Sequence, residues 1–110
     1  MAKFIKGDVV VVPFPFSDLS QAKRRPALVI ADLSGDDLIL CQITSQVISD
    51  NYAISLTDGD FQSGTLKRKS NLRPNRIFTA DINIILYKIG HLKDDKMEEV
   101  IKKIIQIIQA

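Results

Sequence analysis

Three consecutive cations, Lys23, Arg24 and Arg25, precede Pro26 and an apolar run, "PALVIA". Like charges repel, and a charged side chain cannot enter a protein interior without a large loss of hydration. A guanidinium group can hold two phosphate oxygens at once, so this segment is suited to an anionic ligand. Two interpretations follow: an ordinary solvated loop, or a cationic loop that holds an anion beside a rigid strand.

A second group of cations lies between residues 67 and 76 and comprises Lys67, Arg68, Lys69, Arg73 and Arg76. The net charge of the chain is only +2, so the clustering is more informative than the total. Clustered cations are typical of proteins that bind a phosphate-bearing partner. The alternative is a second solvated loop.

Hydroxyl groups follow an apolar run, "LILCQI", at Thr44 and Ser45. At the end of a strand such a hydroxyl either makes a turn or donates a hydrogen bond to a phosphate oxygen. The only cysteine, Cys41, lies within the apolar run, which favours a buried, inert thiol and excludes an intramolecular disulfide. The only histidine, His91, lies just before the last predicted helix, where a structural role is favoured. No cluster of metal ligands is evident, so we expect neither a metal nor a cofactor.

The elements that must position these side chains are mostly short strands. Continuous β-branched or apolar runs predict strands over residues 8–14, 26–31 and 38–43, the last two forming a hairpin around "DLSGDD". Alternation predicts a half-exposed strand over 52–56, and further short strands are expected within 71–81 and 82–92. Residues 57–70 are expected to be a loop.

The C-terminal segment has the pattern of one amphipathic helix. Its apolar residues recur at helical spacing and form one stripe: Met97, Val100, Ile101, Ile104, Ile105 and Ile108. Asp95 and Glu98 have the spacing of a capping box, and Glu98–Lys102 and Glu99–Lys103 are spaced as ion pairs. We expect this helix to pack on the sheet or on a partner.

A chain of 110 residues predicts one domain, residues 1–110. Strands followed by a single helix predict an α+β fold built on a small antiparallel barrel. No apolar run approaches the ~20 residues that cross a bilayer, and the N-terminus lacks the pattern of a signal peptide. A cytoplasmic location is therefore expected.

Three motifs in this order, "KGDVVVVPFPF", "KRRPALVI" and "QITSQ", together with "GHLKDDKMEEV", resemble the PemK/MazF toxin family of bacterial toxin–antitoxin systems. The resemblance implies an SH3-like barrel that forms a homodimer. It also implies a metal-independent, sequence-specific endoribonuclease (an mRNA interferase) that cleaves single-stranded mRNA and leaves 2′,3′-cyclic phosphate and 5′-hydroxyl ends. An acidic antitoxin is implied as the inhibitory partner.

The same resemblance assigns two catalytic residues. Arg25 matches the arginine that precedes a proline, and Thr44 matches the hydroxyl at the end of the next strand. Arg25 is suited to stabilise the transition state, and Thr44 is suited to donate to a phosphate oxygen. Arg73 and Asn75 match a late-strand pair, in which Asn75 replaces the aspartate of some relatives and removes an acid or base. The expected RNA contacts are Lys23, Arg24, Ser45, Lys67, Arg73, Asn75 and Arg76.

Two alternative functions stay open at the level of sequence. A gyrase-inhibiting poison on the same fold would act through its C-terminal residues and would need neither Arg25 nor Thr44. A catalytically silent module would bind RNA or an antitoxin without turnover, an alternative that the missing acid at Asn75 keeps open. Phe14, Phe16 and Gln21 are expected either to contact bases or the antitoxin or to pack on the barrel, and no general base is evident.

Overall fold

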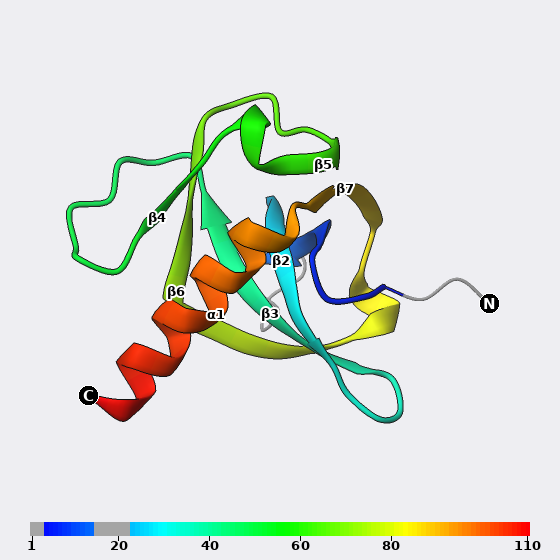
Figure 1. The fold of residues 1–110 in the computed structure, drawn as a ribbon. Coiled ribbons are helices and arrows are strands. Elements are labelled where there is room, and N and C mark those ends of the chain that lie inside the picture. The colour runs from blue at the N-terminus through cyan, green and yellow to red at the C-terminus, as the bar shows by residue number, and fades with distance from the viewer. Residues whose placement is uncertain (1–3, 15–22) are drawn as a thin grey trace.

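The computed structural model describes residues 4–14 and 23–110. In these residues a sheet of seven strands precedes a C-terminal helix, α1 (Asp94–Gln109) (Figure 1). The strands are β1 (Asp8–Phe14), β2 (Lys23–Asp32), β3 (Asp37–Thr44), β4 (Ile54–Leu56), β5 (Phe61–Gly64), β6 (Ser70–Asp81) and β7 (Tyr87–Leu92). Two short 3-10 helices, Asp58–Asp60 and Ile82–Ile84, lie before β5 and β7.

The strands form one sheet in the order β4-β6-β3-β2-β1-β7-β5. Every neighbouring pair is antiparallel. The sheet curls into an open barrel, and α1 crosses one of its faces (Figure 1). The prediction of an α+β fold, an SH3-like antiparallel barrel with a C-terminal amphipathic helix, is confirmed. No helix in the described part of the chain is long and apolar enough to cross a membrane.

The central strands are buried on both faces of the sheet. Val9, Leu28 and Cys41 belong to the core that includes side chains of α1. Val10 and Leu40 belong to a second core, whose described buried residues all lie in strands. Successive side chains of a strand point to opposite faces, so a strand between two cores needs a continuous apolar run. The four consecutive valines of β1 satisfy this need.

Helix α1 buries only part of its apolar stripe. Met97, Val100 and Ile104 are buried in the core, whereas Ile105 and Ile108 are 47% and 70% exposed. Burying each of the three side chains stabilises the fold by roughly 1.5–3 kcal/mol. The stripe was therefore predicted correctly, but its C-terminal end is not covered by the described residues.

The predicted capping box at the start of α1 is wrong. The helix begins at Asp94 after Lys93, which makes no side-chain cap. The N–H of Lys93 donates to the carbonyl oxygen of Asp60 at 2.9 Å, and this contact with the β5 region fixes where the helix begins. Asp94 and Asp95 instead occupy the first turn, where carboxylates favour the positive end of the helix dipole. An ion pair does form between Lys96 and Glu99, at 3.2 Å.

Two segments that were expected to be loops are strands. Lys23, Arg24 and Arg25 form the exposed start of β2 and pair with Phe14, Pro13 and Val12 of β1. A residue before proline is restricted to extended backbone, which favours a strand at Arg25. Within 57–70, residues Phe61–Gly64 form β5, which pairs with β7 at the rim of the sheet.

The carboxylate of Asp8 is buried at the start of β1, with 1% of the residue exposed. It accepts hydrogen bonds from the N–H of Ile5 at 2.9 Å and contacts His91 Nδ1 at 2.8 Å and Lys88 Nζ at 3.2 Å. Burial by itself raises the pKa of Asp8, but these three contacts outweigh it and hold the pKa below its ordinary value. Gly7 makes room for this cluster, because a Cβ there would lie 2.8 Å from Cε1 of His91.

We expect the Asp8→Asn variant to lose about 2 kcal/mol of unfolding free energy at neutral pH, the scale of a hydrogen bond to a charged group. Because the folded pKa is lowered, the stabilisation by Asp8 is present above the unfolded carboxyl pKa of about 3.9 and is lost as the pH falls through the folded value. Urea unfolding of both proteins over a pH series tests this. A difference between them that stays constant from neutral pH to below both pKa values would contradict it.

Candidate active site

The structure brings Arg25 and Thr44 together across two neighbouring strands. In the β2–β3 ladder Ala27 pairs with Gln42, and continuing this register by two residues places Arg25 opposite Thr44. Both residues line one open cavity of about 520 Å³. Three of the predicted RNA contacts, Arg24, Ser45 and Lys67, line the same cavity.

The wall of this cavity is strongly cationic. Its charged residues are Arg24, Arg25, Lys67 and Arg68, and none of the described residues that line it is acidic. All four cations are exposed. Such a surface concentrates positive potential over a small area and favours an anionic ligand.

The turn after β3 holds the hydroxyl of Thr44 in a defined position. The Thr44 Oγ1 atom accepts a hydrogen bond from the N–H of Gln46 at 3.2 Å. The side-chain amide of Asn71, which pairs with Thr44 in the β3–β6 ladder, donates to the carbonyl oxygen of Gln46 at 3.2 Å. Because Oγ1 serves as an acceptor here, the hydroxyl proton of Thr44 can be donated to a ligand.

A second loop supplies Lys67 and Arg68 to the cavity. Ser70 begins β6 and is buried, and its hydroxyl donates to the carbonyl oxygen of Arg68 at 3.0 Å. This bond ties the end of the cationic loop to the sheet. Lys67 and Arg68 line the same cavity as Arg25 and Thr44.

Four predicted RNA contacts lie outside this cavity. Arg73 points to the loop before β4 and forms an ion pair with Asp50 at 3.0 Å. Asn75 and Arg76 are exposed on a bulge of β6, where the register with β3 shifts between Cys41 and Gln42. Lys23 is exposed at the start of β2 and does not line the cavity either.

Asp50 organises the loop between β3 and β4. It accepts hydrogen bonds from the N–H groups of Tyr52 and Ala53, both at 3.0 Å, as well as from Arg73. The N–H of Tyr52 has the largest effect and, with Ala53 and Arg73, holds the pKa of Asp50 below its ordinary value. Arg73 is thereby engaged in holding this loop.

The remaining chemical groups have structural surroundings. Cys41 is fully buried with Sγ 3.2 Å from the carbonyl oxygen of Arg73, and burial raises its pKa to about 12, as expected for an inert thiol. His91 is held by Asp8, and the ring of Phe14 lies 5.9 Å from that of Phe78. Phe16 and Gln21 lie outside the described residues. In the described part of the chain, no three His, Cys, Asp or Glu side chains are grouped as metal ligands.

Sequence reasoning missed three polar residues of the cavity, Thr65, Ser70 and Tyr87. Thr65 stands beside the cationic cluster in the sequence, which was a usable signal. Tyr87 carries no such signal, because it reaches the cavity only through the pairing of β7 with β1.

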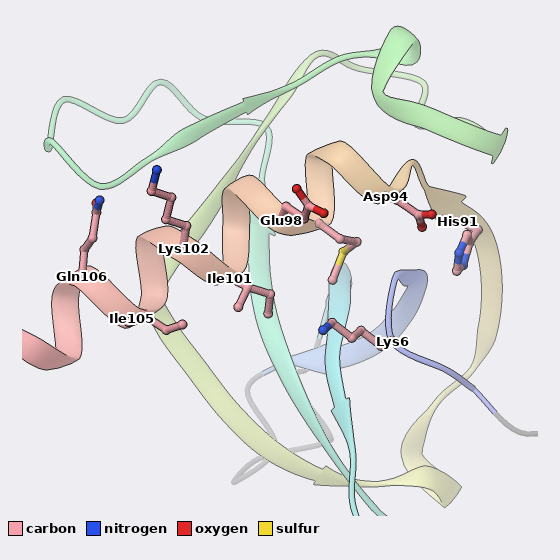
Figure 2. Close-up of a pocket in the computed structure, with 9 residues that line it drawn as sticks. Lys6, His91, Asp94, Glu98, Ile101, Lys102, Ile105 and Gln106 are labelled. Atoms are coloured by element: carbon pink, nitrogen blue, oxygen red, sulfur yellow. The ribbon is translucent and has the colours of Figure 1, made fainter.

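A larger groove of about 820 Å³ runs along α1 and holds none of the predicted site residues. Figure 2 shows Lys6, His91 and Asp94 at one end of it and Ile105 and Gln106 toward the other. Its charges are mixed, with Lys6 and Lys102 facing the same groove as Asp94 and Glu98. The cationic cavity is the better candidate for chemistry because its described lining combines one sign of charge with both Arg25 and Thr44.

Comparison with known proteins gives one family. The model of the PemK-like, MazF-like toxins of type II toxin–antitoxin systems matches residues 5–108. No curated protein of known function matches the sequence.

Solved structures of low sequence identity share the fold. MazF from Deinococcus radiodurans is 19% identical, with all of both chains covered and a TM-score of 0.76. A chain of a MazE–MazF crystal structure from the same organism is 18% identical, with 96% of each chain covered and a TM-score of 0.77. An endoribonuclease in complex with its cognate antitoxin from a mycobacterial species is 11% identical, with 99% of this chain and 96% of that chain covered and a TM-score of 0.75.

We expect Asp50→Ala to speed amide hydrogen exchange at Tyr52 and Ala53, because both N–H groups lose their acceptor. Asp50→Asn is the matched control: it keeps an acceptor oxygen for the loop and removes only the charge that faces Arg73. NMR-detected exchange on the three proteins measures the effect. Equal protection of the two amides in Asp50→Ala and the wild type would show that this carboxylate does not hold the loop.

Proposed function

Because the chain belongs to the family of PemK-like, MazF-like toxins of type II toxin–antitoxin systems, we propose that it is an endoribonuclease that cleaves single-stranded mRNA. The observation that carries the proposal is the cavity whose described lining holds four cations and no acid, with Arg25 and Thr44 both in its wall. A phosphate seated between these two residues meets a permanent positive charge and a hydroxyl donor. Base-specific cleavage would come from the loops and side chains around the cavity.

The reaction proposed is transfer of the phosphoryl group to the neighbouring ribose hydroxyl. The 2′-oxygen loses its proton and attacks phosphorus, while the bond from phosphorus to the 5′-oxygen breaks and that oxygen gains a proton. The products are a 2′,3′-cyclic phosphate and a 5′-hydroxyl. The substrate supplies its own nucleophile, so no metal is needed to generate hydroxide, and metal independence is part of the proposal.

Two groups of the protein have roles in this step. The guanidinium of Arg25 holds the non-bridging oxygens and stabilises the charge that accumulates in the transition state. The hydroxyl of Thr44, whose oxygen is fixed by the N–H of Gln46, donates to one of these oxygens. Arg24, Lys67 and Arg68 attract the flanking phosphates.

The proposed partners are RNA, an antitoxin and a second copy of the chain. An acidic antitoxin segment is complementary to the same four cations and would block the cavity against RNA. The solved neighbours include an endoribonuclease in complex with its cognate antitoxin, which supports this partner. The chain is also proposed to form a homodimer and to act in the cytoplasm.

Arg25→Ala is expected to abolish RNA cleavage, and Thr44→Val to lower kcat by about 10²–10³-fold, the cost of removing one transition-state hydrogen-bond donor. Thr44→Ser keeps the donor and should retain most activity. Each protein is incubated with a long RNA in the presence of EDTA. Sequencing the 5′ ends of the fragments then measures both the extent of cleavage and its base preference.

The matched control is Lys103→Ala, which removes a cation from α1 outside the cavity. Circular dichroism of each variant verifies that the fold is intact. Normal cleavage by folded Arg25→Ala would refute the assigned site. Absence of cleavage by the wild type, with inhibition of gyrase supercoiling instead, would refute the proposed function.

Salt dependence of RNA binding gives an independent measure of the phosphate contacts. Each contact on a single strand contributes about 0.7 to the slope of log K against log salt. We expect Lys67→Gln to reduce the slope by about this amount, whereas Lys103→Gln should leave it unchanged. Fluorescence anisotropy of a labelled oligonucleotide at several salt concentrations provides the slopes, and equal slopes for all three proteins would remove Lys67 from the binding surface.

A further inference from the structure

An exposed aromatic ring lies in the wall of the cationic cavity. Tyr87 begins β7, is 45% exposed and lines the cavity together with Arg24 and Arg25. Sequence reasoning gave this residue no role.

The strand register places Tyr87 close to the proposed reaction centre. Tyr87 pairs with Val11 of β1, and Val11 pairs with Pro26 of β2, the residue after Arg25. Neighbouring strands lie about 4.8 Å apart, so the backbones of Tyr87 and Pro26 are separated by roughly 10 Å across the sheet. A nucleotide whose phosphate contacts Arg25 can bring a nearby base over this part of the wall.

The surroundings of Tyr87 differ from those of a packing residue. Its cavity neighbours Leu66 and Ile89 are half-buried and apolar, whereas the cations lie along the strand ends and the loop. Proteins that bind single-stranded nucleic acid combine a cationic groove for the backbone with aromatic faces for the bases. The cavity has both parts.

We propose that Tyr87 stacks an unpaired base of the RNA next to the phosphate held by Arg25. The inference rests on the proposed function and adds a base-binding position to it. Stacking of this kind tolerates different bases, because every base offers a π-face. Tyr87 is thus a positioning residue that sets where the strand lies relative to Arg25.

The chain offers a direct spectroscopic test, because it has two tyrosines and no tryptophan. The Tyr52→Phe variant emits only from Tyr87, and the Tyr87→Phe variant emits only from Tyr52. The two tyrosines are similarly exposed, at 44% and 45%, but Tyr52 does not line the cavity. Each variant is therefore the matched control of the other.

The probes are short single-stranded oligonucleotides with 2′-O-methyl groups, which lack the nucleophilic hydroxyl and stay intact. Binding is measured by anisotropy of a dye on the oligonucleotide, and stacking by quenching of tyrosine emission. We expect saturable quenching in Tyr52→Phe with the same dissociation constant as the anisotropy, and none beyond inner-filter loss in Tyr87→Phe.

Affinity gives the second readout. Tyr87→Ala should bind roughly 5- to 150-fold more weakly than wild type, and Tyr87→Phe, which keeps the ring, should bind almost normally. Removing single bases from the oligonucleotide should weaken wild-type binding most at one position, and Tyr87→Ala should lose that positional difference. The last comparison separates stacking from a general loss of stability.

The outcomes distinguish this inference from the proposed function. The stacking role would be overturned if RNA is cleaved and bound tightly but the emission of Tyr87 is not quenched. It would also be overturned if Tyr87→Ala keeps the wild-type dependence of affinity on the position of the removed base. Either result would leave the endoribonuclease proposal standing. Failure of the wild type to bind any oligonucleotide would overturn both. Saturable quenching of Tyr87 emission, with no cleavage of RNA by the wild type, would support the stacking role of Tyr87 and refute the proposed endoribonuclease activity.

Discussion

The buried carboxylate of Asp8 is the constraint on which the barrel and its cavity depend. A charge in this position is stable only when its oxygens are satisfied, and here the partners are the N–H of Ile5 and two side chains of β7, Lys88 and His91. Only one register of β7 on β1 brings these partners to Asp8. After a one-residue register shift between Val9 and Val10, the same ladder continues to Val11 opposite Tyr87, so the pairing anchored at Asp8 leads into the cavity wall.

The positions of the cations follow from the two cores. β1, β2 and β3 are buried on both faces along their middle residues, which leaves no room for a charge there. Charged side chains on these strands are therefore confined to strand ends, and Arg24 and Arg25 occupy such an end. Thr44 is the last residue of β3, and the antiparallel β2–β3 hairpin brings this end of β3 to the start of β2. The proposed site thus lies where the apolar runs end, at one edge of the double core.

The sequence predicts what depends on local pattern and misses what depends on pairing. The valines of β1 and the stripe on α1 are local periodicities, and Arg25 and Thr44 belong to short motifs, so all of these were accessible. Arg73 looked equally cationic, but its direction is set by Asp50, more than twenty residues away. Asn75 and Arg76 lie in a bulge of the β3–β6 ladder and do not line the cavity. Pro74 marks that bulge in the sequence, because proline inside a sheet is confined to edges and bulges, but the direction of the neighbouring side chains depends on the pairing. Tyr87 enters through register alone.

The cavity is also a place where function opposes stability. Four cations on one small surface repel one another, and the described lining contains no acid to offset them. Asp50 is bound to Arg73 and holds the loop before β4, and it does not line the cavity. An anion bound in the cavity relieves this repulsion and stabilises the folded state through linkage. RNA and an acidic antitoxin would both be attracted by the same four cations. Their competition for the cavity would therefore follow from its charge distribution.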